Sequence, residues 1–165
     1  MFSVLNNVRL LLTGAWLGAA IFFSAVVAPA AFQVSRGFNL PNPGEVAGAI
    51  VNRTLGAINL SGFVIAVALI LITVLLKKSY RVSSFVVQLV LLTVVAAATA
   101  VGEWVIAAKM RQLRITMAIP IEQVASGDPM RVAFQALHGY SVAALSVAII
   151  AALIAFIFMA RRRLA

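Results

Sequence analysis

Four long apolar stretches run along the chain, and the distance that each can cross limits the folds open to it. They extend over about Leu10 to Phe32, Leu55 to Leu76, Val82 to Ala108 and Leu137 to Ala160, and their only residues of the Asp, Glu, Lys, Arg and His types are Glu103 and His138. At about 1.5 Å of rise per residue, each stretch as a helix reaches across a hydrocarbon core of about 30 Å. Because hydrocarbon offers backbone groups no hydrogen-bond partner, only helices and closed barrels span it. The sequence predicts an all-α integral membrane protein, a four-helix bundle in which residues 1–165 form a single membrane domain.

The composition agrees with a membrane protein and excludes several classes of function. Hydrophobic residues make up 64% of the chain and charged residues 10%, which leaves too little polar surface for a soluble domain. Without cysteine the chain can form no disulfide, thiolate metal site or cysteine nucleophile. The net charge of +9 comes from Lys and Arg at span ends and in short loops, with no basic stripe interleaved with aromatic residues. We therefore expect anionic lipid headgroups as partners and no nucleic acid.

Cations near the span ends predict the orientation of the chain. Arg9 precedes the first span, and dense groups of Lys and Arg lie directly at other span ends, in the loop Lys77 to Arg81 and the tail Arg161 to Arg163. The cations on the opposite side are spread over two longer connections. Because cytoplasmic loops carry an excess of Lys and Arg close to the spans, we expect both termini to be cytoplasmic. We also expect the first span to be retained, since it is too long for the apolar core of a signal peptide.

The second and fourth helices are expected to begin before their membrane spans, as helical extensions on the outer side. Asn42, Pro43 and Glu45 fit the N-cap, N1 and N3 positions of a helix start. Asp128 followed by Pro129 repeats this signal before the fourth span. Each helix would then be about 50 Å long, well beyond the bilayer core. Small residues offer places where the second helix could bend, namely Gly56, Ser61 and Gly62.

The third span is expected to continue past its apolar stretch on the same side. Its helix runs on beyond Lys109 until Pro120, which has no backbone N–H to donate within a helix. Ser126, Gly127 and Asp128 then favour a turn ahead of the fourth helix.

The first helix carries a pair of glycines that predicts close helix packing. Gly14 and Gly18 form a Gly-x-x-x-Gly motif, which lets the backbone of a second helix approach closely. Such motifs are common inside packed membrane bundles, so we favour a contact within one chain. A seam between two copies of the chain is the alternative.

A layer of polar residues near the outer end of the bundle is the best candidate site. Glu103 lies about one turn inside the outer end of the third span, and isolated burial of a carboxylate in a membrane is costly. It has no basic residue three or four positions away on its own helix, so we expect a partner from another helix, either Arg53 or His138. Further polar residues are expected at a similar depth: Asn52, Asn59, Gln135 and Ser141.

This layer has a structural and a functional interpretation. In the structural one, Glu103 forms an interfacial ion pair or extends to the interface beside Trp104, and His138 is a hydrogen-bonded residue between helices. In the functional one, Glu103 and His138 handle a proton, a metal ion or a small solute. One histidine with no cysteine does not supply the converging ligands of a metal or haem site. We therefore expect no metal and no cofactor.

Short motifs occur along most of the chain. They are Trp16-Leu17-Gly18, Phe22-Phe23-Ser24 and Ala28-Pro29-x-x-Phe32 in the first helix, Ala47-Gly48 to Arg53 in the second, and Phe134-x-x-Leu137-His138-x-x-Ser141 in the fourth. Together they resemble the patterns of proteins related to transmembrane protein 205, a largely bacterial family of unknown function. The resemblance implies a four-helix bundle in a bacterial cytoplasmic membrane and a pattern role for Pro29, Glu103 and His138. It implies no established reaction.

No complete catalytic motif occurs in the sequence, so we expect no enzyme. The leading functional prediction is a small non-catalytic integral membrane protein, an accessory subunit of a larger membrane complex. Its partners would be the lipid bilayer and either another membrane protein or a second copy of the chain. The alternative is a binding or transport module that uses Glu103 and His138 for a proton, a metal ion or a small solute.

Overall fold

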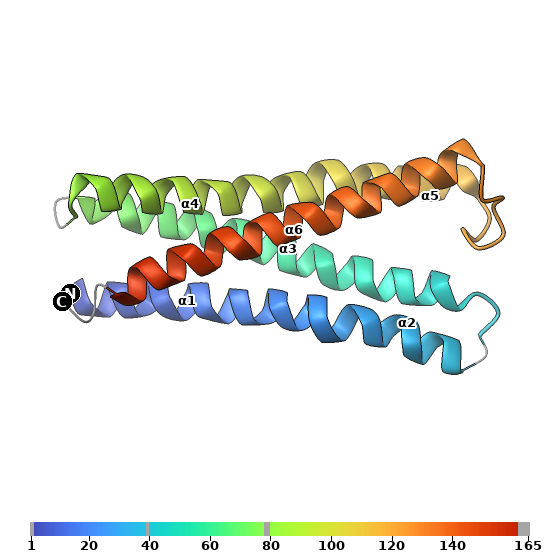
Figure 1. The fold of residues 1–165 in the computed structure, drawn as a ribbon, viewed down its shortest axis with the longest axis horizontal. Helices are drawn as coiled ribbons and strands as arrows, with labels where there is room; N and C mark the ends of the chain where they lie inside the picture. Colours follow the sequence, from blue (N-terminus) through green and yellow to red (C-terminus); the bar gives the residue numbers. More distant parts are fainter. Residues whose placement is uncertain (1, 39, 78–79, 162–165) are drawn as a thin grey trace.

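The computed structural model describes residues 2–38, 40–77 and 80–161, and Figure 1 shows them as long helical rods lying side by side. In chain order the rods are α1 (Phe2–Phe22), η1 (Phe23–Val27) and α2 (Ala28–Gly37); α3 (Pro43–Leu75); α4 (Val82–Ala100), η3 (Val101–Ala107) and α5 (Ala108–Met117); and α6 (Pro129–Arg161). Four helices of these described residues are long and apolar enough to cross a membrane. The prediction of an all-α, four-helix fold is confirmed, and the helices indicate an integral membrane protein.

The rods run alternately up and down, and the two ends of the bundle carry different residues. The start of α1 and the end of α6 lie at one end of the bundle, together with the connection from α3 to α4 (Figure 1), and we name it the terminal end. The other end holds the connections from α2 to α3 and from α5 to α6, and we name it the acidic end because the four acidic residues of the chain lie toward it: Glu45, Glu103, Glu122 and Asp128. Three cations used to predict the orientation, Lys78, Arg162 and Arg163, lie outside the described residues.

Both predicted helix starts are confirmed, although only one has the expected side-chain cap. The Asp128 carboxylate accepts a hydrogen bond from the Met130 backbone N–H at 2.7 Å, at the start of α6. At the start of α3 the Asn42 side chain does not cap the helix. Its Oδ1 instead accepts a hydrogen bond from Gln123 Nε2 at 3.2 Å, which ties together the two connections of the acidic end.

The third rod ends slightly before the predicted stop. Its last helical residue is Met117, and Ala118 follows with a left-handed φ of 55°. A residue in this conformation ends the helical run, and Pro120 also disfavours helix at the residue before it. Pro120 therefore predicts approximately where the helix ends, while the left-handed conformation of Ala118 makes Met117 its last residue.

The second helix runs unbroken into its span. α3 is α-helical throughout, including at the candidate bend points Gly56, Ser61 and Gly62. The irregular segments are the π-helices η1 and η3, in the first and third rods. η1 directly precedes the turn that holds Pro29, whose ring would clash with the carbonyl four residues earlier in a regular helix, and a wider turn relieves that clash. The glycines of α3 have another role, because they admit side chains from neighbouring helices.

Trp16 shows how one of these glycines is used. Its indole is 4% exposed, and its Nε1 donates a hydrogen bond to the Ile58 carbonyl at 3.0 Å. A Cβ placed on Gly62 would lie only 2.6 Å from that Nε1. The core cluster around Trp16 includes small and branched residues, among them three buried alanines of α6: Ala148, Ala151 and Ala152. Small side chains let membrane helices approach closely, so α6 can pack against both α1 and α4.

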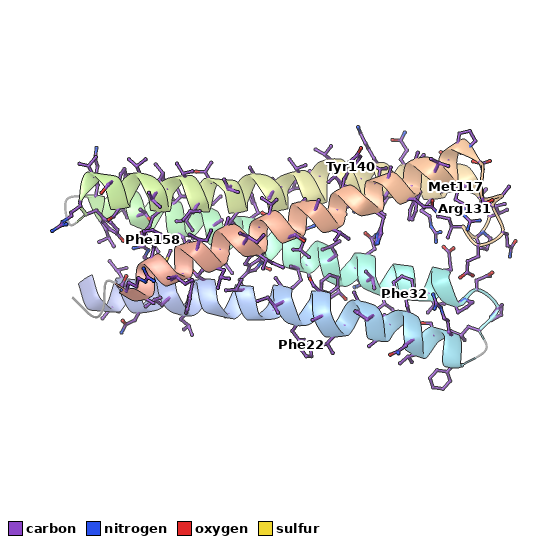
Figure 2. The ribbon with its side chains drawn as sticks, viewed as in Figure 1. Phe22, Phe32, Met117, Arg131, Tyr140 and Phe158 are labelled. Atoms are coloured by element: carbon purple, nitrogen blue, oxygen red, sulfur yellow. The ribbon has the colours of Figure 1, made fainter. Side chains whose placement is uncertain are left out.

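The two glycines of the Gly-x-x-x-Gly motif have different surroundings. A Cβ on Gly14 would lie 3.2 Å from Phe156 Cε2 of α6, whereas a Cβ on Gly18 would meet nothing within 4 Å. The predicted close contact within the chain is therefore present at Gly14 and absent at Gly18. Phe22, one turn further along, also points away from the bundle (Figure 2).

We expect Gly14→Leu to lower the thermal stability of the purified protein and Gly18→Leu to leave it nearly unchanged. The added side chain at Gly14 must displace the Phe156 ring, while the one at Gly18 enters open space. Thermal unfolding in detergent measures the difference, with the exposed Leu11→Ala as a neutral control. Equal losses for both glycine variants would contradict this account and would point to a seam between copies at Gly18.

Candidate functional site

Glu103 lies in η3, and its side chain is only 18% exposed. Its Oε1 accepts a hydrogen bond from Arg111 Nη1 at 3.2 Å. The expectation that the partner would come from another helix is therefore wrong, since Arg111 lies eight residues further along the same rod.

The π-helical turn explains this pairing. Eight residues make about 2.2 turns of an α-helix, which would carry Arg111 well away from the face of Glu103. A π-helix takes more residues per turn, so a path that is partly π-helical makes about two turns over the same eight residues. Residues 103–107 belong to η3 and residues 108–111 to α5, and the two side chains consequently share a face.

The second oxygen of Glu103 faces the backbone of α3. A Cβ placed on Gly56 would lie 3.3 Å from Glu103 Oε2, so the absence of a side chain at Gly56 makes room for the carboxylate. Among the described residues, Oε2 has no hydrogen-bond partner although it is buried. One oxygen of this carboxylate is thus paired at the surface and the other is enclosed between two rods.

Asn59 forms a similar contact one turn further along α3. It is 3% exposed, and a Cβ on Gly102 would lie 3.1 Å from its Nδ2. Each rod therefore places a glycine opposite a polar side chain of the other, Gly56 opposite Glu103 and Gly102 opposite Asn59. Next to this contact the rings of Phe63 and Trp104 meet edge to face, with centroids 4.9 Å apart.

Among the described residues, no hydrogen bond or ion pair joins the remaining members of the predicted polar layer to Glu103. Arg53, Gln135 and His138 are exposed, Asn52 is half-buried and Ser141 is buried. Their neighbour Tyr140 also lies on the outward side of α6 (Figure 2). Within the described part of the chain no hydrogen bond or ion pair involves His138, and no three residues of the His, Cys, Asp and Glu types lie together as a metal site would need.

Beyond these residues the acidic end is held together by polar contacts between rods. Arg114 of α5 pairs with Glu45 of α3, and Glu122 Oε1 accepts a hydrogen bond from the Gly44 backbone N–H at 3.1 Å. Arg131, at the start of α6, donates to the Val124 carbonyl. Figure 2 shows Arg131 beside Met117, where α5 and α6 meet. The ends of the helices are therefore fixed to one another, although they extend beyond the apolar spans.

A second polar cluster lies at the terminal end, and the sequence pattern does not predict it. Arg9 has the sequence position of a cation flanking the first span, yet it is 0% exposed. Its Nη2 donates hydrogen bonds to Thr73 Oγ1 at 3.0 Å and to Gln88 Oε1 at 2.6 Å, and its Nη1 donates to the Tyr80 hydroxyl. Gln88 could have indicated the cluster, because it is the only amide side chain within the third apolar stretch.

The comparisons with known proteins give a family and no relative of known function. A family model with the description "Domain of unknown function (DUF4149)" matches residues 11–118. This range includes Arg53, Asn59 and Glu103 and ends before His138. No curated protein and no solved structure matches the chain.

Proposed function

The chain belongs to the DUF4149 family, a family of unknown function, and we propose that it is a non-catalytic integral membrane protein that serves as an accessory subunit of a larger membrane complex. We infer that it binds its partner protein through the acidic end of the bundle. The observation that carries this proposal is the apolar surface which that end exposes.

Large apolar side chains at the acidic end lie beyond the reach of the hydrocarbon core. Ile115 is 80% exposed and lies about 50 Å along the third rod from Arg81, while the core is about 30 Å thick. Phe38 is 75% exposed and lies about 40 Å along the first rod from Arg9. Further exposed apolar residues at this end are Val34, Val46, Ile50, Ile119 and Val132. Exposed apolar surface outside the lipid core favours an interaction site.

The charges at this end indicate the chemistry of the partner. Two of the four acidic residues, Glu45 and Glu103, are neutralised by ion pairs with Arg114 and Arg111. Other cations remain exposed there: Arg36, Arg53 and Lys109. The proposed partner surface is therefore apolar with acidic residues at its border.

Site-specific photocross-linking in native membranes tests the proposal. We expect a photoreactive amino acid at Phe38 or Ile115 to give one protein adduct of defined mass, because both side chains would be buried against the partner. The same amino acid at Leu71, which is exposed within a span, should react only with lipid. The adduct partner should then co-purify with the unmodified chain in a fixed ratio, and Arg36→Glu should weaken that association.

Adducts with lipid alone at both positions 38 and 115, in membranes where the chain is natively expressed, would contradict the accessory role. Adducts with a second copy of the chain would show that the acidic end forms a homo-oligomer and does not bind a different subunit.

We further infer that both termini are cytoplasmic, so that the acidic end lies on the outer side. This follows from the dense Lys and Arg residues near the terminal end. We also infer that the family is related to transmembrane protein 205, on the motifs around Trp16 and Pro29. With this orientation, the chain would meet its partner outside the cytoplasm.

One observation favours a second candidate function, a proton-binding site used in transport. Glu103 Oε2 is buried without a hydrogen-bond partner among the described residues, and π-helical turns are frequent at functional sites. His138 is exposed, and no hydrogen bond or ion pair among the described residues joins it to Glu103.

We expect Glu103→Gln to fold and to lose little stability, on the order of the 0.6 kcal/mol typical of an intramembrane hydrogen bond, because the amide oxygen still accepts from Arg111. Thermal unfolding measures this cost, and the exposed His138→Asn serves as a neutral control. Proton uptake by proteoliposomes that is present in the original protein and lost in well-folded Glu103→Gln would favour transport over the accessory role.

A further inference from the structure

A groove lies between α1 and α6 near the terminal end of the bundle. It has a volume of about 650 Å³ and is lined by Asn7, Leu10, Leu11, Gly14, Ala15, Phe156 and Ala160. Six of the seven lining residues are apolar, so the groove suits a hydrocarbon ligand.

The groove is open to the surroundings of the bundle rather than enclosed. Leu11 and Ala15 line it and are themselves exposed, so its open side faces the lipid that surrounds the spans. Figure 1 shows why it forms, since α6 crosses the bundle obliquely and meets α1 only near the terminal end. Along α1 the lining extends from Asn7 to Ala15, about 12 Å, which corresponds to the part of an acyl chain next to its headgroup.

The mouth of the groove is polar and positively charged. Asn7 lines it, and the exposed Arg161 directly follows the lining residue Ala160. Lys77 and Arg81 are also exposed at this end of the bundle, and all four acidic residues of the chain lie toward the other end. An anionic headgroup at the mouth would therefore meet favourable charge without a competing Asp or Glu side chain.

We propose that this groove binds one anionic phospholipid, with an acyl chain along α1 and α6 and the phosphate beside Arg161 and Asn7. The arrangement combines an apolar groove that is open to lipid with a cation directly beside its lining at the terminal end. It would give the protein a preference for anionic lipid in the leaflet at its terminal end, independently of any partner bound at the acidic end.

Native mass spectrometry of the purified full chain tests the proposal, with phosphatidylglycerol and phosphatidylcholine of identical acyl chains as probes. We expect one saturable phosphatidylglycerol adduct and weaker binding of phosphatidylcholine. Ala15→Trp fills the groove and should weaken the phosphatidylglycerol adduct about tenfold. Ala143→Trp, at an exposed alanine of α6 that does not line the groove, should leave it unchanged.

The charge at the mouth is tested separately. Arg161→Gln should remove most of the preference for phosphatidylglycerol, while Arg81→Gln, which removes an exposed cation that does not adjoin the groove, should retain it. A phosphatidylglycerol with a photoreactive acyl chain should label the original protein within residues 10–15 and 156–160, which needs no variant to fold.

Three results would overturn the proposal. They are equal binding of both lipids to the original protein, an adduct that Ala15→Trp does not weaken, and photolabelling outside the groove. The proposal would also be overturned if the original protein were a dimer and Ala15→Trp removed the dimer but not the lipid adduct. That result would assign the groove to a second copy of the chain.

Discussion

Gly62→Ala should destabilise the bundle, although replacing glycine by alanine within a helix usually stabilises it by up to about 1 kcal/mol. The new Cβ would lie 2.6 Å from Trp16 Nε1 and 2.7 Å from its Cε2, so the indole must move. That movement breaks the hydrogen bond to the Ile58 carbonyl and disturbs the core around the ring. We expect a net loss of about 3 kcal/mol, from overpacking and an unsatisfied buried donor.

Gly48→Ala is the matched control, since it lies on the same helix and its new Cβ would meet nothing within 4 Å. Unfolding in a denaturing detergent titration should show it to be neutral or slightly stabilising. Combining Gly62→Ala with Trp16→Phe should cost less than the sum of the single losses, because the smaller ring yields space to the new methyl group. Additive losses, or similar behaviour at Gly48 and Gly62, would remove the claim that Gly62 exists to admit Trp16.

Arg9→Met should cost about 2 to 4 kcal/mol of stability, because it leaves the acceptors of Thr73 and Gln88 buried without their donor. Arg9→Lys should recover only part of the loss, since a compact ammonium group cannot reproduce the fork of a guanidinium. Arg81→Met, which removes an exposed cation at the same end, should have little effect. Thermal unfolding of the four proteins measures these differences.

The same cluster can be tested by replacing it as a whole. Arg9→Met combined with Thr73→Val and Gln88→Leu should regain most of the lost stability, because apolar partners leave no buried polar group unpaired. If Arg9→Met alone is as stable as the original protein, the cluster does not hold the terminal end together.

Much of the fold could be predicted because span length and helix starts are local properties of the sequence. The apolar stretches determined the number of helices, and Pro43 and Pro129 marked two helix starts correctly. Asp128 caps its helix as expected because its side chain needs only the adjacent backbone. Asn42 does not, because a residue from a distant loop, Gln123, competes for its oxygen.

The candidate site was less predictable, because it depends on which face each residue occupies. Glu103 has no cation at α-helical spacing on its own helix, and the π-helical turn places Arg111 on its face instead. Arg9 has the sequence position of an ordinary flanking cation, and only the tertiary structure shows its contacts with α3 and α4. Similarly, the space around Gly14 and Gly18 depends on where α6 crosses α1.

The π-helix η3 acts on the third rod as an extra residue would. Every residue from Ala108 to Met117 is rotated by about 100° from the position that an uninterrupted α-helix would give it. A homologue without this π-helical turn would need one residue fewer in this segment to present the same face of the following helix. An alignment that allows no gap between positions 101 and 107 would therefore pair Arg111 and Arg114 with residues of another helix face. It would misplace the basic partners of Glu103 and Glu45.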